Sequence, residues 1–320
     1  MNAAIVHDFK APPRYASFAE PVAGGEEVIV AVSAAGLHPI VKSLASGTHY
    51  GSTGVLPMIP GVDGVGRLQD GTRVFFGASR SPFGSFADRC VTARALCFPV
   101  PETLDDVTVA AIVNPGVSSW AALTVRAGFV AGENVLILGA TGVAGKLAVQ
   151  IAKRLGARRV VAAGRNPAAL EELRGLGADA VISLNAEREA LVASFRRDCA
   201  YDQVHIVLDY LWGTPAETVL EAISQRGLQH SAHRIRFVQI GSSAGATISL
   251  PAATLRSSGL ELIGSGFGSV SMEKIFQSFA DFLREAARQP FQMKTNTAPL
   301  RDVEALWNVA EKGARLVFRP

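Results

Sequence analysis

The residues best suited to chemistry in this sequence are the glycines of the segment Gly139–Gly145, which reads Gly-Ala-Thr-Gly-Val-Ala-Gly. An apolar run, Val135–Leu138, precedes the segment, and a stretch of helical composition follows it. A pyrophosphate needs backbone N–H groups close to its oxygens, and a Cβ atom would block that approach, while the N-terminus of the next helix attracts the anion. The context predicts a dinucleotide site, although a tight turn in a protein that binds another ligand is the alternative. The residues expected at the cofactor are Ala140, Thr141, Gly142, Val143 and Ala144.

The end of the next apolar run distinguishes between two cofactors. NAD-binding proteins usually carry Asp or Glu there, about 20 residues beyond the turn, to hold the ribose 2′-hydroxyl. Here Val160–Ala163 is followed by Gly164, Arg165 and Asn166, with no carboxylate. A guanidinium can pair with a 2′-phosphate, which an acid would repel. The sequence therefore favours NADPH; alternatively, Arg165 is a solvated neighbour of a helix N-cap, since Asn166-Pro167 also reads as a helix start.

The elements that position these residues follow from a change of pattern after Pro115. Short apolar runs, most of them separated by helical stretches such as 146–155 and 167–176, predict six strands. These strands are Val135–Leu138, Val160–Ala163, Ala180–Ser183, Val204–Leu208, Arg236–Ile240 and Leu260–Ile263. Alternating strands and helices predict a parallel sheet with helices on both faces, and six strands match two mononucleotide-binding halves.

The two ends of the chain have a different composition. Residues 1–112 are expected to be β-rich, with strands near 27–32 and 71–76 and frequent glycine and proline. The segment after about residue 263 contains one long amphipathic helix, Met272–Arg288, and a strand at Arg315–Phe318. It is too small for its own core, so it must pack on another part of the chain.

Composition limits the class of protein. A chain of 320 residues suits two domains, and 48% hydrophobic with 18% charged residues describes a globular protein rather than a disordered one. The net charge of +3 comes from scattered basic residues, which argues against nucleic-acid binding. No apolar run of ~18 residues and no signal peptide is recognised, so no membrane partner is expected. Three cysteines fit a reducing cytoplasm, which is the expected location.

Five segments together resemble the medium-chain dehydrogenase/reductase superfamily, and within it the zinc-independent quinone oxidoreductases. They are Gly36–Pro39, Pro60–Gly66, Gly139–Gly145, Leu176–Val181 and Ile240–Ser242, and the resemblance covers nearly the whole chain. It implies an α/β fold with a GroES-like β domain, a Rossmann doubly wound parallel sheet and a C-terminal return to the first domain. The implied domains are a GroES-like catalytic domain, 1–112 with 264–320, and a Rossmann NADPH-binding domain, 113–263. The resemblance also implies a homodimer.

The positions that bind catalytic zinc in the alcohol dehydrogenases of this superfamily are altered here. His38 stands at the first cysteine, Gly61-Val62-Asp63 replaces Gly-His-Glu, and no thiol lies near Asn114-Pro115. The four-cysteine structural zinc lobe is also missing. Because catalytic Zn²⁺ needs three protein ligands and His38 with Asp63 would give two, no metal is predicted.

Two residues are catalytic candidates by the same resemblance. His38 replaces the usual asparagine, and its imidazole is expected near the nicotinamide as a hydrogen-bond donor or proton source; alternatively it is a loop side chain bonded to a backbone carbonyl. Tyr50 matches a tyrosine near the substrate pocket, and its phenol could donate to an oxygen that gains charge, or could serve only as an amphipathic plug.

The remaining cofactor contacts also come from the resemblance. Ser118 or Ser119 is expected at the nicotinamide ribose or carboxamide, unless both cap a helix that starts there. The other expected contacts are Ile240, Gly241, Ser242, Ser265 and Phe267.

These residues predict a zinc-independent enzyme that uses NADPH to transfer hydride to a small molecule, a quinone or an α,β-unsaturated carbonyl compound. Two alternatives stay open. One is an NADPH-binding sensor with little turnover on the same fold, and the other is a zinc alcohol dehydrogenase.

Overall fold

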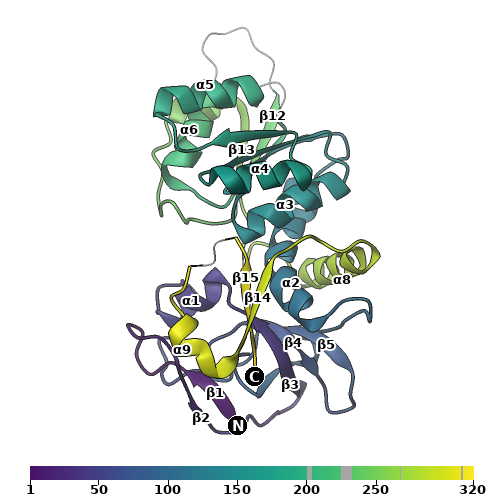
Figure 1. Ribbon diagram of the computed structural model, residues 1–320. Helices are drawn as coiled ribbons and strands as arrows, with labels where there is room; N and C mark the ends of the chain where they lie inside the picture. The colour runs from purple at the N-terminus through teal and green to yellow at the C-terminus, as the bar shows by residue number, and fades with distance from the viewer. Residues whose placement is uncertain (200–203, 225–232, 267, 311–312) are drawn as a thin grey trace. The chain divides into compact units, whose positions relative to one another are not determined.

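The computed structural model describes residues 1–199, 204–224, 233–266, 268–310 and 313–320 (Figure 1). The chain divides into two compact units, Met1–Asn114 with Phe279–Pro320, and Pro115–Ser278. The first division lies close to the predicted boundary at 112–113. The second lies inside helix α8 (Met272–Arg288), whereas the sequence placed it at 263–264, where a strand ends. No change of composition marks the point at which a continuous helix passes from one unit to the other.

The unit Pro115–Ser278 is built on a sheet of six parallel strands, in the order β10-β9-β8-β11-β12-β13. The strands are β8 (Asn134–Leu138), β9 (Arg159–Gly164), β10 (Ala180–Ser183), β11 (Ile206–Asp209), β12 (Arg234–Gln239) and β13 (Gly259–Gly264). The order is that of the doubly wound dinucleotide-binding sheet, so the predicted Rossmann fold class is confirmed. Each strand begins and ends within about two residues of its predicted position.

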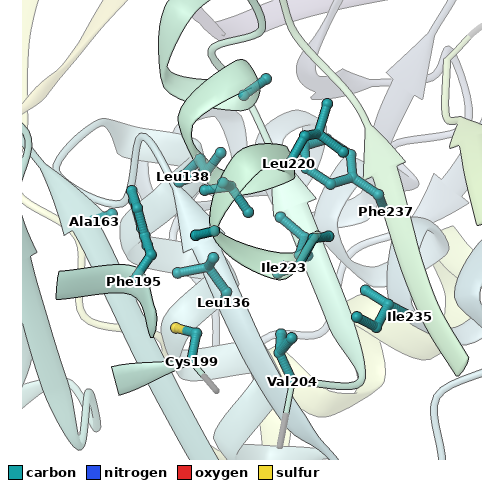
Figure 2. Packing of buried hydrophobic residues seen from close by; sticks show 14 of the residues in the cluster. Leu136, Leu138, Ala163, Phe195, Cys199, Val204, Leu220, Ile223, Ile235 and Phe237 are labelled. Carbon is teal, nitrogen blue, oxygen red and sulfur yellow. The ribbon is translucent and has the colours of Figure 1, made fainter. Parts of the chain in front are cut away.

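Helices on this sheet alternate with its strands, as Figure 1 shows. They are α3 (Val143–Arg154), α4 (Pro167–Gly175), α5 (Arg188–Asp198), α6 (Gly213–Ile223) and α7 (Ala252–Arg256). Figure 2 shows side chains of one buried cluster, which includes Leu136 of β8, Phe237 of β12, Phe195 of α5 and Ile223 of α6. This packed cluster fixes the strand ends that carry the candidate site.

The unit Met1–Asn114 with Phe279–Pro320 is mainly antiparallel. Its larger sheet has the order β14-β15-β3-β4-β5-β7, with β6 also paired to β3, and β1 pairs with β2 separately. The strands are β1 (Asn2–Ile5), β2 (Arg14–Ser17), β3 (Glu27–Gly36), β4 (Asp63–Arg67), β5 (Arg73–Gly77), β6 (Arg89–Ala93), β7 (Cys97–Pro99), β14 (Thr295–Pro299) and β15 (Arg315–Arg319). Because β15 pairs with β3, the C-terminal segment returns to the N-terminal sheet, which fits the predicted GroES-like domain.

Helix α2 (Asp106–Ala121) corrects one expectation from the sequence. Ser118 and Ser119 lie in its last turn and not at a helix start, so neither caps a helix N-terminus. Pro115 lies inside α2, although proline lacks the N–H of a regular helix; the flanking Val113 and Val117 are buried, and their packing outweighs the lost hydrogen bond.

The helical stretch Asp106–Ala127, which is α2 with the π-helical segment Ala122–Ala127, is long and apolar enough to cross a membrane. In the structure, 67% of its most apolar part is buried inside the protein, which is typical of a core helix. The shorter helical segments are α1 (Pro39–Ala45), α9 (Val303–Leu306) and the 3-10 helices Arg94–Leu96 and Leu300–Asp302.

Candidate functional site

The glycine-rich turn lies at the switch point of the parallel sheet. It follows β8, whose neighbours β9 and β11 lie on opposite sides of it. From β8 the sheet therefore extends one way through β9 and β10 and the other way through β11, β12 and β13. Ligands of such sheets bind beyond the carboxyl ends of the strands at this point. The turn therefore stands where a dinucleotide is expected.

The shape of the turn fits a pyrophosphate. Gly139 has φ +83°, and a Cβ on Gly145 would lie 2.4 Å from the Gly139 carbonyl oxygen, so glycine is required for the turn to approach α3. Gly142 is the N-cap of α3 and makes no side-chain cap. Among the described residues the amides of Thr141, Val143 and Ala144 find no acceptor, which leaves donors for an anion at the positive end of the helix.

The end of β9 carries an exposed guanidinium. The Arg165 side chain is exposed and contacts no partner in the part of the chain that is described, while its carbonyl oxygen accepts a hydrogen bond from Asn185 Nδ2 at 2.6 Å. Asn166 is the N-cap of α4, with its Oδ1 3.1 Å from the Ala169 amide, and Pro167 occupies the first helical position. Arg165 is thus both a neighbour of an N-cap and a cation available to a phosphate.

Gly164 links this strand end to the glycine-rich turn. A Cβ at this position would lie 2.4 Å from Thr141 Cγ2, so the Thr141 side chain occupies the space that any other residue would need. The turn after β8 and the end of β9 therefore lie against each other at Thr141 and Gly164.

Ser119 lies beside the turn through its buried hydroxyl. Its Oγ lies 2.7 Å from the Tyr210 hydroxyl, and it donates to the Pro115 carbonyl at 3.1 Å and toward the Ala144 carbonyl at 3.5 Å. Burial raises the pKa of the Tyr210 phenol, which keeps it protonated. Ser118 is only half-buried. Among the described residues, the Ser119 hydroxyl makes a hydrogen bond to this glycine-rich segment and the Ser118 hydroxyl makes none.

The segment after β11 holds residues that the sequence analysis missed. The carboxylate of Asp209 is buried and accepts hydrogen bonds from the Leu211 and Trp212 amides at 2.8 and 3.0 Å. Burial raises the pKa of Asp209 to about 6, against the effect of these two amides. Trp212 has φ +56°, which is strained for a residue with a side chain. The available signal was the predicted strand order, which sets the fourth strand beside the first.

The loops after β12 and β13 lie against this segment. The Ile240 and Gly241 amides both donate to the Asp209 carbonyl oxygen, at 2.8 and 3.1 Å. A Cβ on Gly241 would lie 2.8 Å from the Tyr210 carbonyl oxygen, and the Ser265 amide donates to the Gln239 carbonyl at 2.8 Å. Ile240, Gly241 and Ser265 thus lie near the switch point, with Ser242 next along the chain, whereas Phe267 lies outside the described residues.

In the unit Met1–Asn114 with Phe279–Pro320, the His38 side chain faces the carboxylate of Asp63, a residue of the same unit. Its Nε2 lies 3.3 Å from Asp63 Oδ1, and Asn114 Nδ2 donates to Asp63 Oδ2. His38 and Asp63 are 1% and 4% exposed. The glycine at Gly36 makes room, because a Cβ there would lie 2.7 Å from His38 Nε2. Within the described residues neither ring nitrogen makes a hydrogen bond of good geometry, so the alternative of a bond to a backbone carbonyl is wrong.

Tyr50 has very different surroundings. It is 77% exposed, and its ring lies 4.2 Å from that of His49. Its hydroxyl has no partner in the described part of the chain. The phenol hydroxyl is therefore available to donate to a ligand, while the ring packs on His49.

The three cysteines are poor candidates for a nucleophile, since burial raises the pKa of each thiol. Burial raises the pKa of the Cys97 thiol to about 11 and that of Cys199 to about 12, and Cys90 is fully buried in β6. These are the core or strand positions expected for the cysteines. Across the described ranges, no three residues of the types His, Cys, Asp and Glu are grouped so that they could hold a metal ion.

Comparison with known proteins gives concordant matches. Residues 144–287 match the family described as zinc-binding dehydrogenase. The chain is 27% identical to the probable NADPH-dependent quinone reductase tdiC of Emericella nidulans, over the whole of both proteins. It is 28% identical to the trans-enoyl reductase pgmF of Aspergillus terreus, a match that spans 61% of this chain and 60% of that enzyme. The crystal structure of the quinone oxidoreductase of Thermus thermophilus, also solved with NADPH, superposes over all of both chains with a TM-score of 0.81 and 26% identity.

Proposed function

The chain belongs to the medium-chain dehydrogenase/reductase superfamily, in its quinone oxidoreductase-like branch, and from that premise we propose that it is a zinc-independent reductase. It uses NADPH to reduce a quinone or an α,β-unsaturated carbonyl compound. The observation that carries the proposal is the unpartnered guanidinium of Arg165 at the end of β9, next to a turn whose amides are open within the described chain. The similarities to an NADPH-dependent quinone reductase and a trans-enoyl reductase support both acceptor classes.

Different residues of the parallel-sheet unit bind different parts of the cofactor. The amides of Thr141, Val143 and Ala144 bind the pyrophosphate, flanked by Ala140 and Gly142, and Arg165 binds the 2′-phosphate beside Gly164 and Asn166. We assign the nicotinamide half to Ser119 and the loops after β12 and β13. Those loops contribute Ile240, Gly241, Ser242, Ser265 and Phe267, and Ser118 is the weaker candidate because its hydroxyl makes no hydrogen bond to the turn among the described residues.

The chemistry then depends on charge that appears on the acceptor. When bound, NADPH supplies hydride to the conjugated carbon or the quinone ring. Negative charge develops on the acceptor's carbonyl oxygen, and a donor held in place stabilises it. We assign that role to the imidazole of His38 or the phenol of Tyr50. The carboxylate of Asp63 accepts a hydrogen bond from Asn114 and faces the imidazole.

Zinc independence rests on the donor set at the positions expected for zinc ligands. Val62 offers no ligand atom, and Asn114 directs its amide nitrogen at Asp63. The remaining His38 and Asp63 are fewer than the three protein ligands that catalytic zinc takes, so the residues present do not fit this metal. The match to zinc-binding dehydrogenases begins at residue 144 and does not include these positions.

The setting of the enzyme is part of the same proposal. We place it in the cytoplasm, acting on a small molecule with no membrane or nucleic-acid partner, because its cysteines are free and its basic residues are scattered. We also propose a homodimer. Strand β13 pairs with β12 alone among the described strands, and an open sheet edge of this kind is a common place for two copies to join.

Turnover with a panel of acceptors tests the function. Purified, chelator-treated protein is mixed with NADPH and with a quinone, an enone or the matching saturated ketone, and the loss of NADPH absorbance is followed. We expect oxidation with the quinone or the enone and none with the saturated ketone. His38→Asn and Tyr50→Phe identify the donor, because losing the group that stabilises the oxygen costs roughly 10²–10³ in kcat.

The same assay separates the alternatives. Tight NADPH binding without oxidation by any acceptor would favour a sensor. Activity on an alcohol that disappears with chelator and returns with zinc would favour a zinc alcohol dehydrogenase.

A further inference from the structure

We propose that Asn185 is the residue that positions Arg165 for the 2′-phosphate, and is thereby a determinant of selectivity for NADPH over NADH. The inference rests on the proposed function. It concerns a residue outside the glycine-rich turn and outside the Gly-Arg pair that the sequence singled out.

Asn185 reaches Arg165 from the neighbouring strand. It follows β10, which runs parallel to β9 with Ser183 opposite Gly164. Its Nδ2 donates to the Arg165 carbonyl at 2.6 Å, and the preceding Leu184 amide donates to the Gly164 carbonyl at 2.8 Å. One short segment after β10 thus holds both carbonyl groups of the Gly-Arg pair.

The other sides of the pair are held as well. The Thr141 side chain occupies the space beside Gly164, and Asn166 begins α4 as its N-cap. The Arg165 backbone is therefore fixed by the turn after β8, by α4 and by Asn185. Of these three contacts, the bond from Asn185 is the one that a side chain makes to Arg165 itself. In the described structure the Asn185 side chain makes no other hydrogen bond.

A fixed Arg165 backbone favours NADPH over NADH, because only NADPH carries the 2′-phosphate that Arg165 binds. An arginine side chain loses conformational entropy when it binds a phosphate. If its backbone is already fixed, the guanidinium samples fewer positions before binding, so this entropy loss is smaller. NADH has no 2′-phosphate, so it gains nothing from a well-placed Arg165. Asn185 acts only through Arg165 and is a positioning residue.

The size of the effect follows from the exposure of this hydrogen bond. Asn185 and Arg165 are both exposed, so water can replace part of the lost interaction. Loss of one such bond corresponds to a roughly 3- to 10-fold weaker affinity for NADPH.

Binding titrations test the proposal without any turnover. Dissociation constants for NADPH, NADH and adenosine 2′,5′-bisphosphate are measured by calorimetry for the wild type, Asn185→Ala, Arg165→Ala and the double variant. Ser183→Ala is the matched control. The Ser183 hydroxyl accepts a hydrogen bond from the backbone N–H of Asn185 at 3.4 Å and makes none with Arg165 in the described structure.

We expect Asn185→Ala to weaken the binding of NADPH and of adenosine 2′,5′-bisphosphate by roughly 3- to 10-fold and to leave the affinity for NADH unchanged. The Ser183→Ala control should bind all three ligands as the wild type does. In the Arg165→Ala background the second substitution should add nothing, since the two residues act as one unit. Equal weakening of NADPH and NADH, or an additive effect in the double variant, would overturn the positioning role. If the wild type binds neither NADPH nor the bisphosphate, the proposed function itself fails; if Arg165→Ala weakens NADPH and Asn185→Ala does not, only this inference fails.

Discussion

Asp209 is a carboxyl group whose surroundings raise its pKa well above the ordinary value. Its carboxyl group is buried at the end of β11, where the Leu211 and Trp212 amides donate to it and its own carbonyl accepts from the loop after β12. Its folded-state pKa of about 6 lies above the ordinary value of 3.8. The folded protein therefore holds this proton more tightly than the unfolded chain does, so the stability it contributes is present below about pH 4 and is lost as the pH rises through about 6.

An Asp209→Asn variant removes this titration. The free energy of unfolding of the wild type, relative to that of the variant, should fall between about pH 4 and pH 6 by up to about 3 kcal/mol, and the difference should be constant above that range. Urea unfolding at several pH values measures it. If the two stability curves run parallel from pH 4 to pH 7, the carboxyl group is not held in the way described.

Individual residues were predictable from the sequence where their role depends on local chain geometry. The glycines of the turn and the missing acid after β9 belong to a strand–turn–helix–strand segment, and the structure places them as that segment requires. Tyr210, Asp209 and Asn185 could not be found in this way. Tyr210 and Asn185 act through hydrogen bonds to residues 91 and 20 positions away, Ser119 and Arg165, and the Asp209 carboxyl group is buried at the end of β11; these surroundings exist only after the strands have assembled.

At the level of elements, α3 packs very closely against the turn of the candidate site. Gly145, in the first turn of α3, lies against the backbone of Gly139 and Ala140, and a Cβ would come within 2.4 Å and 2.5 Å of atoms of these two residues. Backbone atoms cannot move aside as a side chain does, so a larger residue must displace the turn or the helix.

Gly145→Ala should therefore destabilise the protein by about 1–3 kcal/mol and weaken NADPH binding, because the amides of the turn leave their positions. Gly175→Ala is the matched control: Gly175 ends α4 in an exposed position, a methyl group added there would meet no atom within 4 Å, and the substitution should be neutral. Thermal unfolding and a cofactor titration on both variants give the answer. Equal behaviour of the two variants would contradict the close approach.

Elements with a regular pattern were also predictable. The six parallel strands and the helix Met272–Arg288 were identified because periodic apolar residues and their spacing specify them. Helix α2 was not, since Pro115 within it reads as a break, and only the burial of its neighbours keeps the helix continuous. Helix α1, which begins after His38 with Pro39 in its first turn, was too short for a periodic signal.

For the whole molecule, the predicted residues are divided between the two units. The unit Pro115–Ser278 contains every predicted cofactor residue that the structure describes, and the unit Met1–Asn114 with Phe279–Pro320 contains His38, Tyr50 and the Asp63–Asn114 pair. The return of β15 to β3 makes the second unit from both ends of the chain, which composition alone did not predict and the family resemblance did. The assignment of roles between the units stays a prediction that the variants above address.

We propose that the guanidinium at the end of β9 gives this reductase its preference for NADPH. The most direct test of this preference is the ratio of kcat/KM for NADPH to that for NADH, measured on chelator-treated wild-type protein with one quinone or enone acceptor. A single charge-assisted contact with the 2′-phosphate predicts a ratio of roughly 10 to 100 in favour of NADPH. A ratio of about one or below, or no oxidation of either cofactor by any quinone or enone, would contradict the account.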